Sequence, residues 1–89
     1  SGRVGLWISK KMKEISLLSQ VITISHLPQV IANADHLYLV SKDVINNITY
    51  SNIKQLNENE KLIEVSKMMT GNDTDTSKKA AQDLINYFK

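Results

Sequence analysis

The chain has 89 residues and a formal net charge of +2, and its 42% hydrophobic and 22% charged residues are typical of a globular protein. This length suffices for one small domain and leaves no room for a second catalytic lobe. The sequence contains no cysteine, which excludes disulfide scaffolds, cysteine nucleophiles and zinc-thiolate sites. The absence of cysteine fits a reducing, cytoplasmic setting, and because no apolar run approaches the roughly 20 residues that span a bilayer, we expect a soluble protein.

The first half of the sequence predicts a helix, a strand and a second helix. Apolar residues spaced three and four apart indicate an amphipathic helix. These residues are Val4, Ile8, Met12, Ile15 and Leu18. The β-branched run over residues 20–25 predicts a strand covered on both faces. Pro28 fits the first turn of a short helix over residues 28–34, where its missing N–H costs no hydrogen bond.

A β-hairpin is predicted next. Residues 35–42 and 48–56 have the pattern of strands, and the pair Asn46 and Asn47 between them favours a turn. We therefore expect an α/β fold with about three strands, made of one strand-helix-strand unit plus the hairpin and packed with three to four helices.

Two helices are predicted to follow the hairpin. Asn57 and Glu60 have the spacing of a capping box and predict the start of a helix. Gly71 predicts its end, because glycine is common just after the last turn of a helix. After a polar linker, the apolar spacing predicts a last helix from about Asp75 to Phe88.

Tests for a self-contained nucleotide-binding or metal-dependent enzyme are negative. A P-loop needs two glycines five residues apart, followed by Lys and then Ser or Thr, yet the glycines are Gly2, Gly5 and Gly71. The two histidines, His26 and His36, lie ten residues apart and lack the further protein ligands that a zinc site needs. We therefore expect no metal site within the chain.

His26 stands where the predicted strand ends and the next helix begins. In open α/β sheets this edge binds ligands, because strand ends and helix N-termini leave N–H groups facing a common crevice. His26 is therefore a candidate phosphate-contacting residue, and the alternative is a histidine satisfied by local backbone. Gln29, three residues later, either contacts a ligand as a secondary site residue or pairs with the N–H groups of the helix.

A long block of the sequence is similar to one bacterial family. The block reads QVITISHLPQVIA over residues 20–32 and continues with Ala34-Asp35-His36 and Leu39-Val40-Ser41-Lys42. It resembles the C-terminal part of RecN, a family of bacterial DNA double-strand-break repair ATPases. Further similar stretches are Ser1-Gly2-Arg3-Val4 and EVSKMMTG over residues 64–71. The similarity covers nearly the whole chain.

This resemblance implies a fold and a set of site residues. RecN proteins resemble the SMC group of ABC-type ATPases, in which ATP binds between two heads. Residues 1–89 would be the C-terminal portion of one P-loop ABC-type head, a single incomplete domain. His26 would be the catalytic switch histidine that contacts the γ-phosphate and helps to hold the attacking water. Ser1, Gly2 and Arg3 would end the D-loop at the nucleotide and dimer interface.

The resemblance also implies partners and cofactors. ATP and Mg²⁺ would serve the complete protein, with none bound to this part alone, because the family's P-loop, signature motif and Walker B residues lie upstream. The partners would be the missing N-terminal lobe of the same head, a second head in an ATP-dependent homodimer, and DNA through the complete protein, with no membrane. The location would be the bacterial cytoplasm, in association with the nucleoid.

A second function class stays open, namely a stand-alone protein-interaction module without nucleotide chemistry. Its partner would bind the hairpin edge at residues 48–56 or the last helix. An exposed apolar edge favours a fragment, whereas a covered or charged edge favours an independent module. Lys10, Lys11 and Lys13 could contact a phosphate backbone, but a solvated helix face explains them more readily because the net charge is small.

Overall fold

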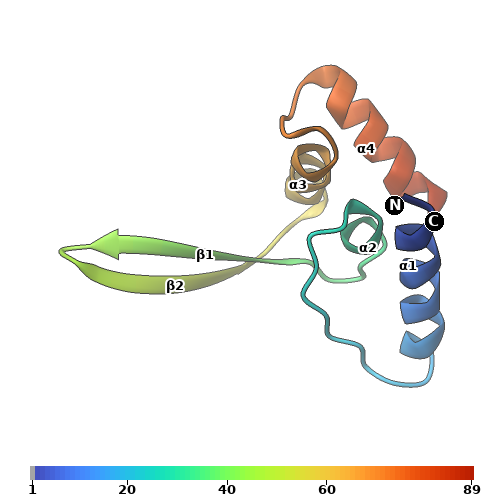
Figure 1. The fold of residues 1–89 in the computed structure, drawn as a ribbon, viewed down its shortest axis with the longest axis horizontal. Coiled ribbons are helices and arrows are strands. Elements are labelled where there is room, and N and C mark those ends of the chain that lie inside the picture. Colours follow the sequence, from blue (N-terminus) through green and yellow to red (C-terminus); the bar gives the residue numbers. More distant parts are fainter. Residues whose placement is uncertain (1) are drawn as a thin grey trace.

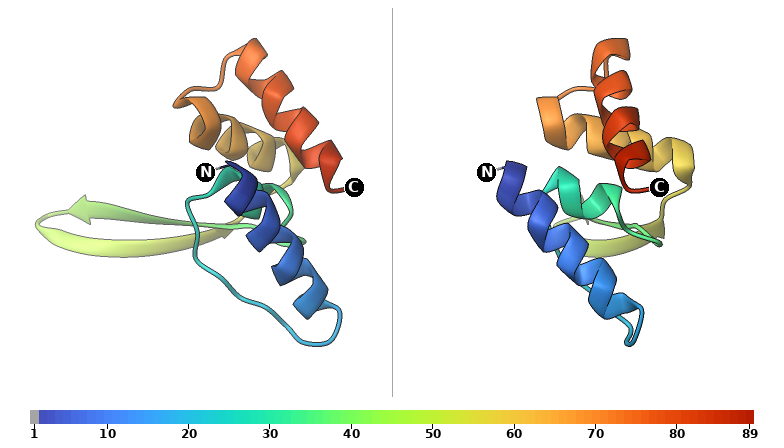
Figure 2. Two further views of the ribbon diagram at one scale, coloured as in Figure 1. Left: turned by 45° about the vertical axis from the view of Figure 1, so that its right-hand side comes forward. Right: turned by 90° about the vertical axis from the view of Figure 1, so that its right-hand side faces the viewer.

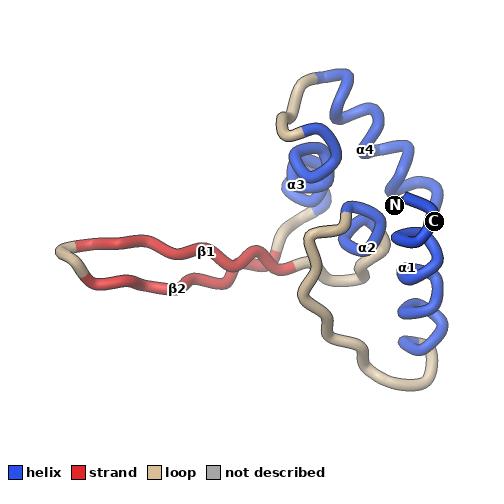
Figure 3. Tube along the Cα trace, in the orientation of Figure 1, coloured by secondary structure: helices blue, strands red, loops and turns tan. Residues whose placement is uncertain are grey.

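The computed structural model describes residues 2–89 as four helices and one β-hairpin (Figure 1). In chain order the elements are α1 (Gly2–Ser16), α2 (Pro28–Ala32), β1 (Tyr38–Ile45), β2 (Ile48–Gln55), α3 (Glu58–Thr70) and α4 (Asp75–Tyr87). The hairpin projects away from the helices, so helices and strands occupy separate parts of the molecule (Figure 3). The chain is thus a small α/β structure, as predicted.

The hydrophobic core lies where α2 meets α3 and α4. Its buried members are Ile31, Ala32, Val65, Ala81 and Ile85. Helix α2 also contacts α1, so this five-residue helix lies between α1 and the pair formed by α3 and α4 (Figure 2). A helix this short is not stable by itself, and the packing on both sides holds it in place.

The predicted capping signals of α3 are confirmed. Asn57 accepts a hydrogen bond of 2.8 Å from the backbone N–H of Glu60, and the Glu60 carboxylate accepts one of 3.1 Å from the backbone N–H of Asn57. Gly71 ends the helix with a φ of 80°, a conformation that favours glycine. Thr74 then caps α4 by accepting a hydrogen bond from the N–H of Ser77.

The predicted hairpin is also confirmed. β1 and β2 pair antiparallel, and Asn46 and Asn47 form the turn with φ values of 52° and 64°. A type I′ turn requires positive φ at both central residues. This turn suits a two-residue hairpin, because its backbone twist matches the right-handed twist of the two strands. Both strands consist of exposed residues along their whole length.

The predicted strand over residues 20–25 is wrong. These residues form an extended connection from the end of α1 to the start of α2, in which Ile22 is 84% exposed and Ile24 is fully exposed. A β-branched run becomes a strand only where a neighbouring strand accepts its backbone hydrogen bonds. The sheet formed within residues 2–89 contains β1 and β2. The strand-helix-strand unit is therefore absent from the described residues, and two strands replace the expected three.

The apolar stripe predicted for α1 also differs from the face that is buried. Val4 and Ile15 are more than half exposed, whereas Gly5 and Ser9 are buried against α2. Small residues allow two helix backbones to approach closely, so α2 packs on this narrow face. The apolar stripe is therefore buried only in part, at Ile8 and Met12.

Candidate functional site

His26 lies at the end of the extended connection, just before α2. Its side chain is exposed. The next residue, Leu27, is the N-cap of α2 in an extended conformation, and its backbone N–H donates a hydrogen bond of 3.0 Å to the hydroxyl of Ser25. Pro28 then opens the helix, as the sequence predicts. The imidazole is thus held at a helix start with its ring accessible.

Gln29 connects this helix start to the beginning of α1. A Cβ placed on Gly5 would lie 2.8 Å from Gln29 Oε1, and one placed on Gly2 would lie 3.5 Å from Gln29 Nε2. The Gln29 side chain therefore occupies space that a larger residue at position 5 would take. It lies along the first turns of α1.

The predicted site residues are thus brought together only in part. Gly2 lies beside Gln29, and His26 is three residues from Gln29 along the chain. Arg3 is exposed on α1, and Ser1 falls outside the described residues. The starts of α1 and α2 lie near one another in the two turned views (Figure 2). The contact of His26 with a phosphate stays a prediction.

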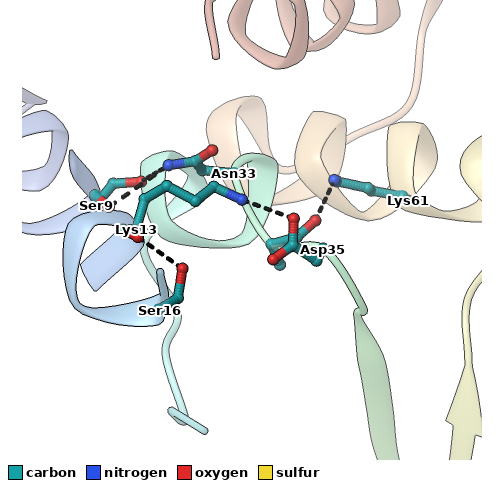
Figure 4. A network of polar contacts seen from close by, with 7 residues as sticks. Ser9, Lys13, Ser16, Asn33, Asp35 and Lys61 are labelled. Atoms are coloured by element: carbon teal, nitrogen blue, oxygen red, sulfur yellow. Dashed lines mark hydrogen bonds and ion pairs between the residues drawn. The ribbon is translucent and has the colours of Figure 1, made fainter. Parts of the chain in front are cut away.

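A polar network fixes the other end of α2, and sequence reasoning did not identify it. Asn33, the C-cap residue of α2, donates a hydrogen bond of 3.1 Å to the hydroxyl of Ser9 in α1. Lys61 in α3 donates one of 2.9 Å to the backbone carbonyl of Ala34. Figure 4 shows these side chains converging from α1 and α3 on the residues that follow α2.

One ion pair extends this network. Lys13 in α1 lies 2.7 Å from Asp35, and the hydrogen bond from its ammonium lowers the pKa of Asp35 below the ordinary value of 3.8. Lys61 is 8% exposed, and its burial lowers the pKa of its ammonium. A signal for Lys61 was available in the sequence, because it stands four residues before Val65 on the same helix face.

The surface beside this network is an open depression of about 250 Å³. Its lining mixes lysines and carboxylates, including Lys13, Asp35 and Lys61, with the apolar side chains of Ile85 and Phe88. This volume falls below the usual range for small-molecule pockets, about 300–1,000 Å³. We therefore assign no ligand to it.

Metal-binding geometry is absent from the described part of the chain, where no three His, Cys, Asp or Glu side chains gather in a way that could hold an ion. His36 lies at the base of the hairpin, with its Nδ1 3.3 Å from Gln55 Nε2. Likewise, within residues 2–89 no helix is both long and apolar enough to cross a membrane.

An exposed apolar surface covers one side of α1 and the connection that follows it. We call this the α1 apolar surface, and its exposed residues are Val4, Trp7, Ile15, Leu17, Leu18, Ile22 and Ile24. Large apolar side chains exposed in such number are a feature of interaction surfaces. Of the stripe predicted to face a core, Val4, Ile15 and Leu18 are exposed, whereas Ile8 and Met12 are partly buried.

Comparison with known proteins identifies the family. No protein-family model matches the chain. The chain is 42% identical over 87 residues to DNA repair protein RecN of Halalkalibacterium halodurans, and 41% identical over 87 residues to that of Bacillus subtilis. It is 33% identical over 85 residues to that of Streptomyces coelicolor.

These alignments cover 94–96% of the chain but only 15% of each relative. The chain therefore spans about one-seventh of the length of the curated relatives that it matches, consistent with a C-terminal RecN fragment. The resemblance carried by residues 20–32 is confirmed. The chain belongs to the RecN family of DNA repair proteins.

Proposed function

We propose that this chain is the C-terminal part of an ABC-type ATPase head in a RecN protein that acts in DNA double-strand-break repair and recombination. In this proposal ATP and Mg²⁺ bind between two heads of a homodimer in the bacterial cytoplasm, and DNA is a partner of the complete protein. The observation that carries the proposal is the position of the Gln29 side chain beside Gly5 and Gly2. It brings the proposed dimer-interface segment and the His26 segment to the same end of the molecule.

His26 supplies chemistry that suits a γ-phosphate. An imidazole N–H donates a hydrogen bond to oxygen atoms on which negative charge grows during phosphoryl transfer, and such donors matter most in the transition state. The exposed position of His26 leaves its ring available to a nucleotide. The residues that cradle the phosphates and hold Mg²⁺ would come from the rest of the protein, because the glycines of this chain do not form a P-loop.

The α1 apolar surface supports the proposal that this chain packs on the remainder of the same head. The relatives are several times longer than the chain, so most of the protein lies outside these residues. Exposed side chains such as Trp7, Ile22 and Ile24 are then buried by the missing lobe. In that setting residues 20–25 gain a strand neighbour, which the described residues do not provide.

The test is His26→Ala in the complete protein. We expect ATP turnover to fall about 10²-fold with little change in the affinity for ATP, because the lost donor acts mainly in the transition state. His36→Ala is the matched control, because His36 is also exposed but lies at the base of the hairpin, and its turnover should stay at the wild-type level. Unchanged turnover in His26→Ala would refute the assignment.

A second candidate is a protein-interaction module that uses the hairpin. The observation in its favour is that both strands are exposed along their length and carry apolar side chains, among them Val40, Tyr50 and Ile53. A partner strand could pair with either outer edge. Tyr50→Lys in the complete protein tests this candidate. If the hairpin is the functional surface, the substitution abolishes partner capture and leaves ATP turnover intact.

A further inference from the structure

Two side chains from different helices hold the end of α2 that lies away from His26. Lys61 reaches from α3 to the carbonyl of Ala34, and Asn33 bonds to Ser9 in α1. The last carbonyl groups of a helix lack intrahelical partners and carry its partial negative charge. Ala34 directly follows Asn33, the C-cap residue of α2, so the Lys61 ammonium satisfies a carbonyl just beyond the helix and lies near its partial negative charge.

The burial of Lys61 shows that this contact is not an ordinary surface interaction. Lysine is among the residues that are almost never fully buried without a partner, yet Lys61 is 8% exposed and faces the core side of α3. Removing an ammonium from water is unfavourable, so its hydrogen bond to the Ala34 carbonyl must offset that cost. Glu58 and Asp35 add favourable charge nearby, and Lys13 and Lys89 oppose it.

The short length of α2 makes this anchor relevant to His26. Five helical residues rise by only about 7.5 Å, so the helix moves as a rigid unit and a tilt at one end displaces the other. His26 stands two residues before Pro28, the first residue of α2. The direction in which its imidazole points therefore depends on how α2 is held between α1 and α3.

We propose that Lys61 is a positioning residue that fixes α2 and thereby orients His26 toward the reacting phosphate. This inference rests on the function proposed above. Lys61 itself touches no nucleotide in this scheme. Its effect on ATP turnover passes through α2 to His26, and a displacement of about 1 Å is enough to cost up to 10²-fold in rate.

A double-mutant cycle in the complete protein tests this role. Lys61→Met keeps the length and apolar stem of the side chain but removes the donor and the charge. We expect it to lower kcat about tenfold with an unchanged KM for ATP. In the His26→Ala background the same substitution should change kcat by less than about twofold, because the group through which Lys61 acts is gone.

Three further variants sharpen the cycle. Lys61→Arg retains a donor and a charge and should restore most of the lost turnover. Lys61→Gln keeps a polar group that is too short to reach the Ala34 carbonyl, and it provides the cycle if Lys61→Met does not fold. Lys67→Met removes an exposed lysine from the same helix and should leave kcat unchanged.

The outcomes separate the two proposals. If His26→Ala leaves turnover unchanged, the proposed function fails. If His26→Ala lowers turnover but Lys61→Met either has no effect or lowers kcat equally in both backgrounds, the proposed function stands and the positioning role is overturned. A loss of turnover in Lys61→Met that disappears in the His26→Ala background supports both.

Discussion

The ammonium of Lys13 in α1 donates a hydrogen bond of 2.7 Å to the carboxylate of Asp35, which lies 22 residues later in the chain. This pair ties α1 to the segment between α2 and β1. Because Lys13 favours the ionised carboxylate, the pKa of Asp35 lies below 3.8. The stabilisation is fully present above pH 3.8 and is lost as the pH falls through the lowered pKa of the folded state.

Asp35→Asn should therefore lower the free energy of unfolding at pH 7 by about 0.5 kcal/mol, a small value because the carboxylate is well exposed and screened by solvent. Denaturant titrations at several pH values should show this difference shrinking below pH 3.8. Asp73→Asn, at an exposed position, is the control. A difference that grows as the pH falls would contradict the sign of the effect.

Val65 is fully buried at the centre of the core, against α2 and α4. Val65→Ala removes two methyl groups and leaves a cavity, so the free energy of unfolding of the chain should fall by roughly 2 kcal/mol. Ile24→Ala removes a larger side chain from a fully exposed position and should change it by less than about 0.5 kcal/mol. Equal effects at the two positions would show that the core is placed incorrectly.

Asn47 adopts a φ of 64° at the second central position of the hairpin turn. Asn47→Gly should raise the hairpin population, because glycine is preferred there in a type I′ turn. Asn47→Ala should destabilise the hairpin by about 1 kcal/mol, because most side chains disfavour the left-handed conformation. The intensity of NMR cross-peaks between the paired residues Val44 and Thr49 measures both changes, and identical intensities in the two variants would refute the turn assignment.

The α1 apolar surface makes a prediction about the complete protein. Because the chain contains no cysteine, Ile24→Cys provides a unique label site within these residues. We expect maleimide to react slowly with it in the complete protein, where the remainder of the head covers it, and rapidly in the 89-residue chain. Lys79→Cys, on the exposed side of α4, should react rapidly in both. Rapid labelling of Ile24→Cys in the complete protein would favour the interaction-module function.

The local signals of the sequence predicted most of the helices and the hairpin correctly. The Asn57 and Glu60 capping box, Gly71 at a helix end and the Asn46 and Asn47 turn each act within a few residues, so their structural effect does not depend on distant partners. Family membership was also predictable, because residues 20–32 form a long and specific block.

The features that the sequence did not predict depend on contacts far along the chain. Residues 20–25 have strand composition, but a strand also requires a neighbour, and the described residues supply none. The inward face of α1 was missed because Gly5 and Ser9 pack through small size rather than hydrophobicity. The helix period places Lys61 on the same face as Val65, but its partner, the carbonyl of Ala34, lies 27 positions away, and no local pattern indicates that contact.

The turn between α3 and α4 has a consequence for the kinetics of folding. The hydroxyls of Thr70 and Ser77 lie 2.8 Å apart, and Ser66 bonds to the carbonyl of Asn72 at 2.9 Å, so a cluster of neighbouring residues closes this helical pair. Contacts between segments close in sequence form fastest during folding. Helices α3 and α4 are therefore expected to assemble first. Helix α2 packs on their shared surface in a later step, and only then are the orientation of α2 and the position of His26 fixed.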